Sequence, residues 1–294
     1  LPLLPDREPE ILTDMTQIAS VCQEKGIDSV LVITDPGIAQ LGLMDPMIEA
    51  LEAADIHVAV YSDVVPNPTI DNVEAARTMY LENNCKALVG FGGGSAMDCA
   101  KVTGARIAKG FQKVPQMRGL LKILTPIPLL FAVPTTAGTG SEVTVAAVIT
   151  DARTHHKYPI NDFVLIPRYA VHDPRVTFSL PKHITSTTGM DALTHAVEAY
   201  IGRSTTKYTR EMSEVAVRLI HDYLLRAYEN PTDEEARAKM LYASYCAGIA
   251  FTQSYVGYVH GVAHSLGGQY GTPHGLANAI ILPHFLRRYG KKCV

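Results

Sequence analysis

The sequence predicts an α/β domain built on a parallel sheet, followed by an all-helical domain. In the first half, short apolar runs alternate with segments of helical spacing, which is typical of a parallel sheet covered on both faces. Turns rich in glycine and hydroxyl side chains follow two of these runs. Beyond about residue 180 helical periodicity continues and strand signals nearly vanish. We therefore expect an α/β domain over residues 1–180 and a helical domain over residues 181–294.

The expected elements follow from these patterns in chain order. Buried parallel strands are continuous apolar runs, because both of their faces are covered. Such runs are Ser29–Thr34, His57–Tyr61, Lys86–Phe91 and Leu129–Val133, with Val145–Ile149 and Phe163–Ile166 as further expected strands. Helical spacing predicts helices at Pro46–Ala54, Thr69–Asn83, Thr187–Tyr200, Thr209–Tyr228 and Asp233–Phe251, and around His260.

Composition excludes several classes of protein. The 294 residues carry a formal net charge of −3 and are 47% hydrophobic, so neither nucleic acid nor an acidic membrane surface is an expected partner. The longest apolar runs are too short to span a bilayer, and no signal peptide is visible. Five cysteines without a CxxC pair argue against a disulfide framework and favour a reducing, cytoplasmic compartment. The chain begins at Leu1 and stops after a basic run, so we expect a truncated sequence with an incomplete helical domain.

A glycine-rich turn, Phe91–Asp98, lies between an expected strand and an expected helix. Gly92, Gly93 and Gly94 allow a ligand to approach the backbone closely, and the helix N-terminus offers free N–H groups. This arrangement suits a pyrophosphate. The alternative is an ordinary tight turn with Ser95 as the helix N-cap.

A second small-residue loop, Pro134–Glu142, also follows a strand and offers several hydroxyl groups. Alone it is equally consistent with a solvated loop. Two such loops after strands of one parallel sheet would lie at the same carboxyl edge, where α/β proteins bind ligands. The sequence thus indicates a Rossmann-like nucleotide domain, although Thr34-Asp35-Pro36-Gly37 replaces the usual GxGxxG after the first strand.

Asp35 closes the first of these strands. A carboxylate there would accept hydrogen bonds from an adenine ribose and repel a 2′-phosphate, which favours NAD over NADP. The alternative is a turn residue preceding Pro36.

A second group of residues has the spacing of metal ligands. Asp191 and His195 are four residues apart and would share one helix face, as would His260 and His264. His274 follows a glycine-rich turn that allows it to fold back toward them. Carboxylate and imidazole ligands suit Fe(II), Zn(II), Co(II) or Ni(II), and the lack of cysteine argues against a structural zinc site. The alternative is that Asp191 and His195 form an intrahelical pair and that the later histidines are core or loop residues. Other histidines are expected to be surface or packing residues, among them His57, His155, His172 and His221.

These motifs together resemble the iron-containing (group III) alcohol dehydrogenase family, from Val30 to about Arg288. Gly92–Asp98 resembles its GGGSxxD phosphate loop, Pro134–Val143 its second cofactor loop, and Thr188–Glu198 with Gly257–Gly275 its metal-binding signatures. The resemblance implies a metal held by Asp191, His195, His260 and His274, with His264 near the nicotinamide. The cofactor-binding residues that we expect are Asp35, Gly92, Gly93, Gly94, Ser95, Asp98, Thr135, Thr136, Thr139, Ser141, Val143 and Lys157.

The implied activity is reversible hydride transfer between a small alcohol or aldehyde and NAD(H), with Fe(II), or alternatively Zn(II), polarising the substrate oxygen. His264 is a candidate proton relay, and Phe251, Tyr255 and Leu266 are expected to line the substrate pocket. A homo-oligomer, such as a dimer, is expected by the same resemblance. The alternatives are a zinc-dependent polyol dehydrogenase of the glycerol type, a dehydroquinate-synthase-like lyase, and a metal- and nucleotide-binding sensor without turnover.

Overall fold

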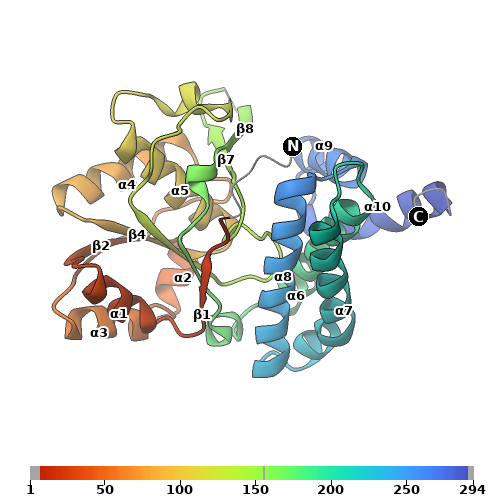
Figure 1. The fold of residues 1–294 in the computed structure, drawn as a ribbon, viewed down its shortest axis with the longest axis horizontal. Coiled ribbons are helices and arrows are strands. Elements are labelled where there is room, and N and C mark those ends of the chain that lie inside the picture. The colour runs from red at the N-terminus through yellow and green to blue at the C-terminus, as the bar shows by residue number, and fades with distance from the viewer. Residues whose placement is uncertain (1–6, 155, 291–294) are drawn as a thin grey trace. The chain divides into compact units, whose positions relative to one another are not determined.

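The structure, a computed structural model, describes residues 7–154 and 156–290. Two compact units are present. Among the described residues, one comprises Arg7–Thr135 and Ser141–Asp173, and the other comprises Thr136–Gly140 together with residues 174–290. The first unit is α/β and the second is helical (Figure 1), which confirms the predicted fold class. The predicted boundary between the two domains, near residue 180, remains a proposal.

The α/β unit is centred on a six-stranded sheet. Its strands, in spatial order, are β1 (Glu10–Leu12), β9 (Tyr169–Val171), β6 (Leu129–Pro134), β4 (Ala87–Gly92), β2 (Ser29–Ile33) and β3 (His57–Tyr61). Every pairing between neighbours is parallel. The register pairs Ile33 with Gly90, and Gly90 with Ala132. The carboxyl ends of β2, β4 and β6 therefore lie close together at one edge of the sheet.

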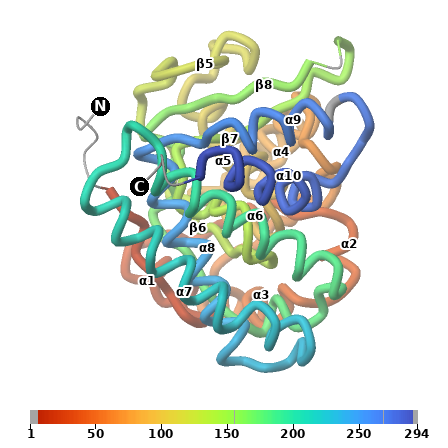
Figure 2. The backbone as a smooth tube through the Cα atoms, turned by 90° about the vertical axis from the view of Figure 1, so that its right-hand side faces the viewer, coloured from red at the N-terminus to blue at the C-terminus, as the bar shows by residue number. Residues whose placement is uncertain are grey.

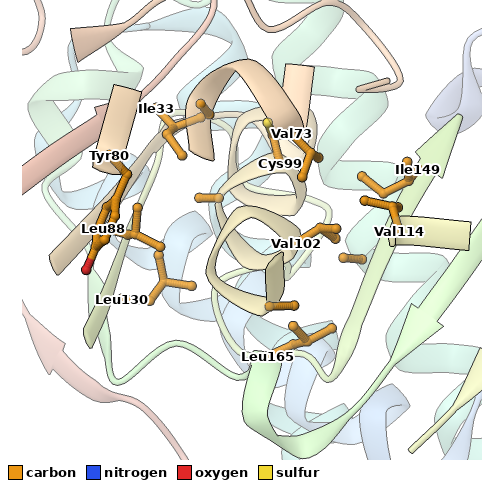
Figure 3. Close-up of a cluster of buried hydrophobic side chains, with 14 of the residues drawn as sticks. Ile33, Val73, Tyr80, Leu88, Cys99, Val102, Val114, Leu130, Ile149 and Leu165 are labelled. Carbon is orange, nitrogen blue, oxygen red and sulfur yellow. The ribbon is translucent and has the colours of Figure 1, made fainter. Parts of the chain in front are cut away.

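Helices cover both faces of this sheet. Helices α4 (Ile70–Glu82) and α5 (Gly94–Ala108) lie on one face, and α1 (Gln17–Glu24) and α3 (Asp45–Ala53) lie on the other (Figure 1). The main core fills the space beneath α4 and α5, where Figure 3 shows their apolar side chains meeting those of the strands. Its fully buried members include Ile33, Val73, Leu88, Cys99 and Val102. This core fixes the start of α5 relative to the sheet edge.

A small second sheet joins this core. Strand β7 (Ala146–Asp151) pairs antiparallel with β8 (His156–Asn161), which also pairs with the short β5 (Gly119–Leu120). The strand expected at Phe163–Ile166 was wrong, because Phe163–Leu165 is a 3-10 helix. The Asp162 carboxylate explains the difference, since it accepts hydrogen bonds from the backbone N–H groups of Val164, Ile123 and Leu124 and so starts a helical turn.

The second unit is a bundle of helices. It contains α6 (Lys182–Ile201), α7 (Lys207–Glu229), α8 (Glu234–Ser254), α9 (Tyr258–Tyr270) and α10 (His274–Tyr289). Helices α6, α7 and α8 lie side by side, as do α9 and α10 (Figure 2). Gly189 lets α6 approach α7 closely, because a Cβ there would lie 2.4 Å from the Leu224 Cδ1 atom. None of the helices in the described residues has the length and apolar character needed to cross a membrane. Cys22, Cys85, Cys99 and Cys246 are buried and form no disulfide bond among the described residues, and Cys293 lies outside them.

Candidate metal and cofactor sites

The strand order of the α/β unit contains a topological switch point between β2 and β4. The chain passes from β2 to β3 on one side and then returns to place β4 on the other side. Ligands of open α/β sheets bind outside the carboxyl ends of the strands at such a point. Asp35 follows β2 and Gly92 ends β4, so the two predicted cofactor segments lie on either side of it. The Asp35 Oδ2 atom lies 3.4 Å from the position that a Cβ on Gly92 would take.

The backbone around Gly92 requires glycine. Its φ is +151°, and a Cβ would lie 2.8 Å from that of Ala96. The N-cap of α5 is Gly93, which has no side chain to satisfy the free N–H groups. The N-cap expected at Ser95 was therefore wrong; the Ser95 Oγ instead accepts a hydrogen bond from Asn67 N at 3.2 Å. The N-terminus of α5 is thus open to an anionic ligand.

Asp35 does act as a helix cap. Its Oδ1 accepts a hydrogen bond from Ile38 N at 2.9 Å, at the start of the short helix α2 (Pro36–Gln40). One oxygen of Asp35 therefore has the turn role that the alternative interpretation expected. The second oxygen faces Gly92, so capping and ribose binding are compatible.

Lys157 is connected by hydrogen bonds to the N-terminus of α5. Its Nζ donates a hydrogen bond to Asn67 Oδ1 at 2.6 Å, and Asn67 in turn contacts Ser95. Asn67 has a positive φ of 56°. Asparagine is one of the residues that tolerate this conformation. The hydrogen bonds join β8 to the glycine loop through one asparagine.

Asp98 contacts protein groups that connect the two predicted loops. Its carboxylate accepts hydrogen bonds from Ser141 Oγ at 2.7 Å and from Val148 N at 2.9 Å. One turn further along α5, the buried Lys101 ammonium donates to Thr144 O, Thr144 Oγ1 and Ala146 O at 2.9–3.2 Å. Burial lowers the pKa of Lys101 to about 8, although the negative charges of Asp98 and Glu142 act to raise it. Helix α5 thereby holds the end of the second loop through two side chains.

The second loop itself is divided between the units. Thr135 N donates to Gly92 O at 2.9 Å within the α/β unit, where Ser141 and Val143 are also buried. Thr136 and Thr139 belong to the segment assigned to the helical unit. Within that unit, Gly138 lies against α6, since a Cβ there would be 2.5 Å from Thr188 O. The hydroxyl-rich segment therefore lies one turn before Asp191.

The predicted metal ligands come from three helices of the helical unit. Asp191 and His195 lie one turn apart on α6, His260 lies in the first turn of α9, and His274 is the first residue of α10. Gly271 ends α9 in the left-handed conformation, with φ +67°, and allows the chain to reverse. Gly275 then lets α10 lie against α6, because a Cβ would be 2.1 Å from Thr187 O. This close approach brings His274 to Asp191.

The potential ligand atoms converge on one point. Asp191 Oδ1 lies 3.4 Å from Nε2 of His260, 3.4 Å from Nε2 of His274 and 3.9 Å from Nε2 of His195. The ligand atoms of Asp191, His195 and His260 all lie within 4.8 Å of one another, and these three residues are buried. One carboxylate and three imidazoles fit a transition metal of the iron and zinc class. The donor set present therefore fits the metal implied by the sequence.

The electrostatics of the cluster favour positive charge at its centre. Burial lowers the pKa of His195 to about 3, so this imidazole is neutral and can act as a ligand. Burial also opposes ionisation of Asp191, but the neighbouring imidazoles, His195 foremost, outweigh it and lower the pKa of this carboxyl. For His260, burial is outweighed by hydrogen bonds to Asp191 and Glu198, which raise its pKa to about 9. The buried carboxylates of Asp191 and Glu198 thus stabilise positive charge at His260. A bound metal ion would supply positive charge in the same place.

Two further polar residues of this cluster were missed by the sequence analysis. Asn278 is fully buried, and its Nδ2 lies 2.7 Å from Asp191 Oδ1 and 3.2 and 3.3 Å from Nε2 of His274 and His260. Glu198 contacts Nδ1 of His260 at 2.6 Å. Their signals in the sequence were spacings of four residues after His274 and three after His195. Each places the residue on the same helix face as a ligand.

The remaining predicted residues of the helical unit lie near the cluster or beside it. His264 is exposed, with its ring stacked on His274 at 4.7 Å between centroids. Phe251 stacks on His195 at 4.3 Å. Tyr255 is exposed, and Leu266 packs against the small core beneath α9 and α10.

The other histidines lie elsewhere. His57 and His221 are exposed, and His172 is buried with its Nε2 atom 3.7 Å from Glu142 Oε1. His155 lies outside the described residues.

Comparisons with known proteins identify the family of this chain. The family described as iron-containing alcohol dehydrogenase matches residues 13–174, and its C-terminal counterpart matches residues 185–294. Alcohol dehydrogenase 4 of Schizosaccharomyces pombe is 42% identical over 92% of this chain, which spans 64% of that relative's length. The chain thus spans less than two thirds of the length of this relative.

Solved structures agree as well. A crystal structure of 1,3-propanediol oxidoreductase matches with a TM-score of 0.92 and 37% identity, covering 96% of this chain and 74% of that one. Sulfoacetaldehyde reductase from Bifidobacterium kashiwanohense, solved with NAD+, matches with a TM-score of 0.88 and 32% identity, covering 98% and 78%. The lyase and polyol alternatives are not favoured by these relatives. The chain belongs to the iron-containing alcohol dehydrogenase family.

Proposed function

We propose that this protein catalyses reversible hydride transfer between a small alcohol or aldehyde and NAD(H), with a divalent metal at the cluster of Asp191, His195, His260 and His274. The convergence of three imidazole Nε2 atoms on Asp191 Oδ1, at 3.4–3.9 Å, carries the proposal. A metal held there supplies a Lewis acid for the substrate oxygen, and the nicotinamide accepts or donates the hydride. Oxidation of an alcohol would then give the aldehyde or ketone, NADH and a proton.

The side chains have distinct parts in this proposal. Asp191 would supply negative charge, and His195, His260 and His274 would supply nitrogen donors, with His260 losing its second proton when the metal binds. The open N-terminus of α5, at Gly93 and Gly94, would bind the pyrophosphate of the cofactor. Asp35 would accept hydrogen bonds from the adenine ribose and disfavour a 2′-phosphate.

Proton movement is assigned to His264. Its exposed ring stacks on His274, so it is placed between solvent and the ligand cluster of its own unit. Imidazole titrates near neutrality and can pass a proton to water. We assign Lys157, Asp98, Ser95, Thr135, Thr136, Thr139, Ser141 and Val143 to cofactor binding or to the support of the cofactor loops.

Fe(II) is the proposed metal, with Zn(II) as the alternative, and the proposed location is the cytoplasm. The lack of a disulfide bond among the cysteines of the described residues is consistent with a reducing compartment. We further propose a homo-oligomer, a dimer being the simplest form. Light scattering during size-exclusion chromatography measures this state directly, and a monomeric mass would contradict it.

The decisive experiment follows NADH absorbance after short alcohols and diols are added to protein purified without oxygen and reloaded with Fe(II). Zinc-loaded protein and an Asp191→Ala variant are the controls. We expect turnover that requires the metal and Asp191. Binding of metal and NAD without turnover, in a version as long as the relatives, would contradict the proposed enzyme and favour the sensor.

A further inference from the structure

Glu198 lies three residues beyond His195 on α6, on the same helix face as Asp191 and His195. Its carboxylate is buried, with 4% of the residue exposed. Four donors contact it: the backbone N–H groups of Gly257 at 3.0 Å, Val259 at 2.8 Å and His260 at 3.3 Å, and His260 Nδ1 at 2.6 Å. One side chain therefore joins α6 to both the backbone and a side chain of α9.

The backbone contacts make Glu198 a helix cap supplied by another helix. The N-cap of α9 is Gly257, which has no side chain to satisfy the free N–H groups of the first turn. A carboxylate at this end also interacts favourably with the helix dipole. A Cβ on Gly257 would lie 2.6 Å from Glu198 Oε1, so the glycine makes room for the carboxylate.

The contact with His260 determines which nitrogen of that ring carries the hydrogen. An ionised carboxylate only accepts hydrogen bonds. His260 Nδ1 must therefore donate, and in the neutral ring Nε2 then has a free lone pair. That Nε2 atom is the one that lies 3.4 Å from Asp191 Oδ1, at the centre of the ligand cluster.

We propose that Glu198 is a positioning residue of the metal site, which fixes the start of α9 and holds His260 in the tautomer that presents Nε2 to the metal. The inference rests on the proposed metal site and extends it to a residue outside the ligand set. Partners of this kind orient a ligating imidazole and raise its basicity. One face of α6 thus carries two proposed ligands, Asp191 and His195. It also carries Glu198, which supports a third ligand, His260.

Glu198→Gln tests this assignment with almost no change of side-chain size. The glutamine oxygen can still accept hydrogen bonds from the backbone of α9, while its NH2 group would donate to His260 Nδ1. That donation favours hydrogen on Nε2, which competes directly with the metal. We expect Co(II) to bind about 10–100-fold more weakly than to the wild type, with an altered visible absorption spectrum of the bound Co(II).

Asp233→Asn is the matched control. Asp233 is the N-cap of α8 in the same unit and accepts a hydrogen bond from Ala236 N at 3.0 Å, but it contacts none of the four ligands. Both variants weaken a helix cap, so both should unfold at a lower temperature. Only Glu198→Gln should lose Co(II) affinity.

Equal Co(II) affinity and equal spectra for the two variants would overturn the inference and leave Glu198 as a cap alone. If Glu198→Gln does not fold, 15N NMR of the Zn(II)-loaded wild type decides the question, because the inference requires the metal on Nε2 and hydrogen on Nδ1 of His260. Metal on Nδ1 with hydrogen on Nε2 would refute it. A wild type that binds no Co(II) at all would instead remove the proposed metal site, so the two failures are distinguishable.

Discussion

The buried ammonium of Lys101 should make the stability of the protein depend on pH, and Lys101→Met should remove that dependence. Lys101 is fully buried, and its ordinary pKa of 10.5 falls to about 8, mainly because of burial. Between these two values the unfolded chain carries a proton on Lys101 that the folded protein lacks. The free energy of unfolding therefore rises with pH across this interval, and the cost of burying the charge is fully present below pH 8.

The size of the effect follows from the two pKa values. The difference between 10.5 and about 8 corresponds to about 3 kcal/mol. At pH 7, methionine would relieve this cost, but it would leave the oxygens of Thr144 and Ala146 without their donor, at about 1 kcal/mol or more each. The two effects nearly cancel, so stability at a single pH does not separate them. The change with pH depends on the charge alone.

Urea unfolding of both proteins between pH 7 and pH 10.5 measures this change. Buried thiols act in the opposite direction, since burial raises the pKa of Cys99 to about 12 and stability falls above the ordinary thiol value. The difference between wild type and variant cancels such shared groups. We expect the wild type to gain about 3 kcal/mol relative to Lys101→Met, and Thr144→Val, which removes one acceptor and keeps the ammonium, to behave like the wild type. A difference that stays constant across this range would refute the reasoning.

Three other substitutions test the proposed sites separately. His260→Ala should abolish Co(II) binding in equilibrium dialysis and leave NAD binding intact; retained Co(II) affinity would remove His260 from the ligand set. Gly92→Ala introduces strain of about 1–3 kcal/mol and should weaken NAD binding in calorimetry by roughly tenfold or more, without loss of Co(II) binding. Asp35→Gly and the cap-retaining Asp35→Ser should both reduce the preference for NAD over NADP in fluorescence titrations, and an unchanged preference in Asp35→Ser would mean that Asp35 acts only as a cap.

Much of the fold was predictable because the buried parallel strands are continuous apolar runs. Ser29–Ile33 and Ala87–Gly92 were found in this way, within one residue of the predicted ends. Strand β8 was missed, because His156–Asn161 contains histidine, lysine and proline and is buried only at Tyr158 and Ile160. Helix α10 was missed for a different reason. Gly275 and Pro283 weaken its helical signal, although packing against α6 and α9 stabilises it.

The candidate metal site was predictable where spacing alone places residues together. Asp191 and His195 share a face of α6 by periodicity. Local spacing could not show that α9 and α10 bring His260 and His274 to that face, and only the resemblance to a known family connected them. Glu198 and Asn278 were missed because their contacts cross between helices.

Asp98 illustrates why a motif and a contact are different kinds of information. The motif Gly92–Asp98 indicates a phosphate loop, and its last residue was therefore expected among the cofactor-binding residues. In the structure both carboxylate oxygens of Asp98 accept hydrogen bonds from the protein, at Ser141 and Val148. The same motif can thus encode a loop that binds a ligand and the side chain that holds a neighbouring loop in place. Because Lys101 holds Thr144 and Ala146 from the next turn of the same helix, one helix, α5, contacts both the glycine loop and the end of the second loop.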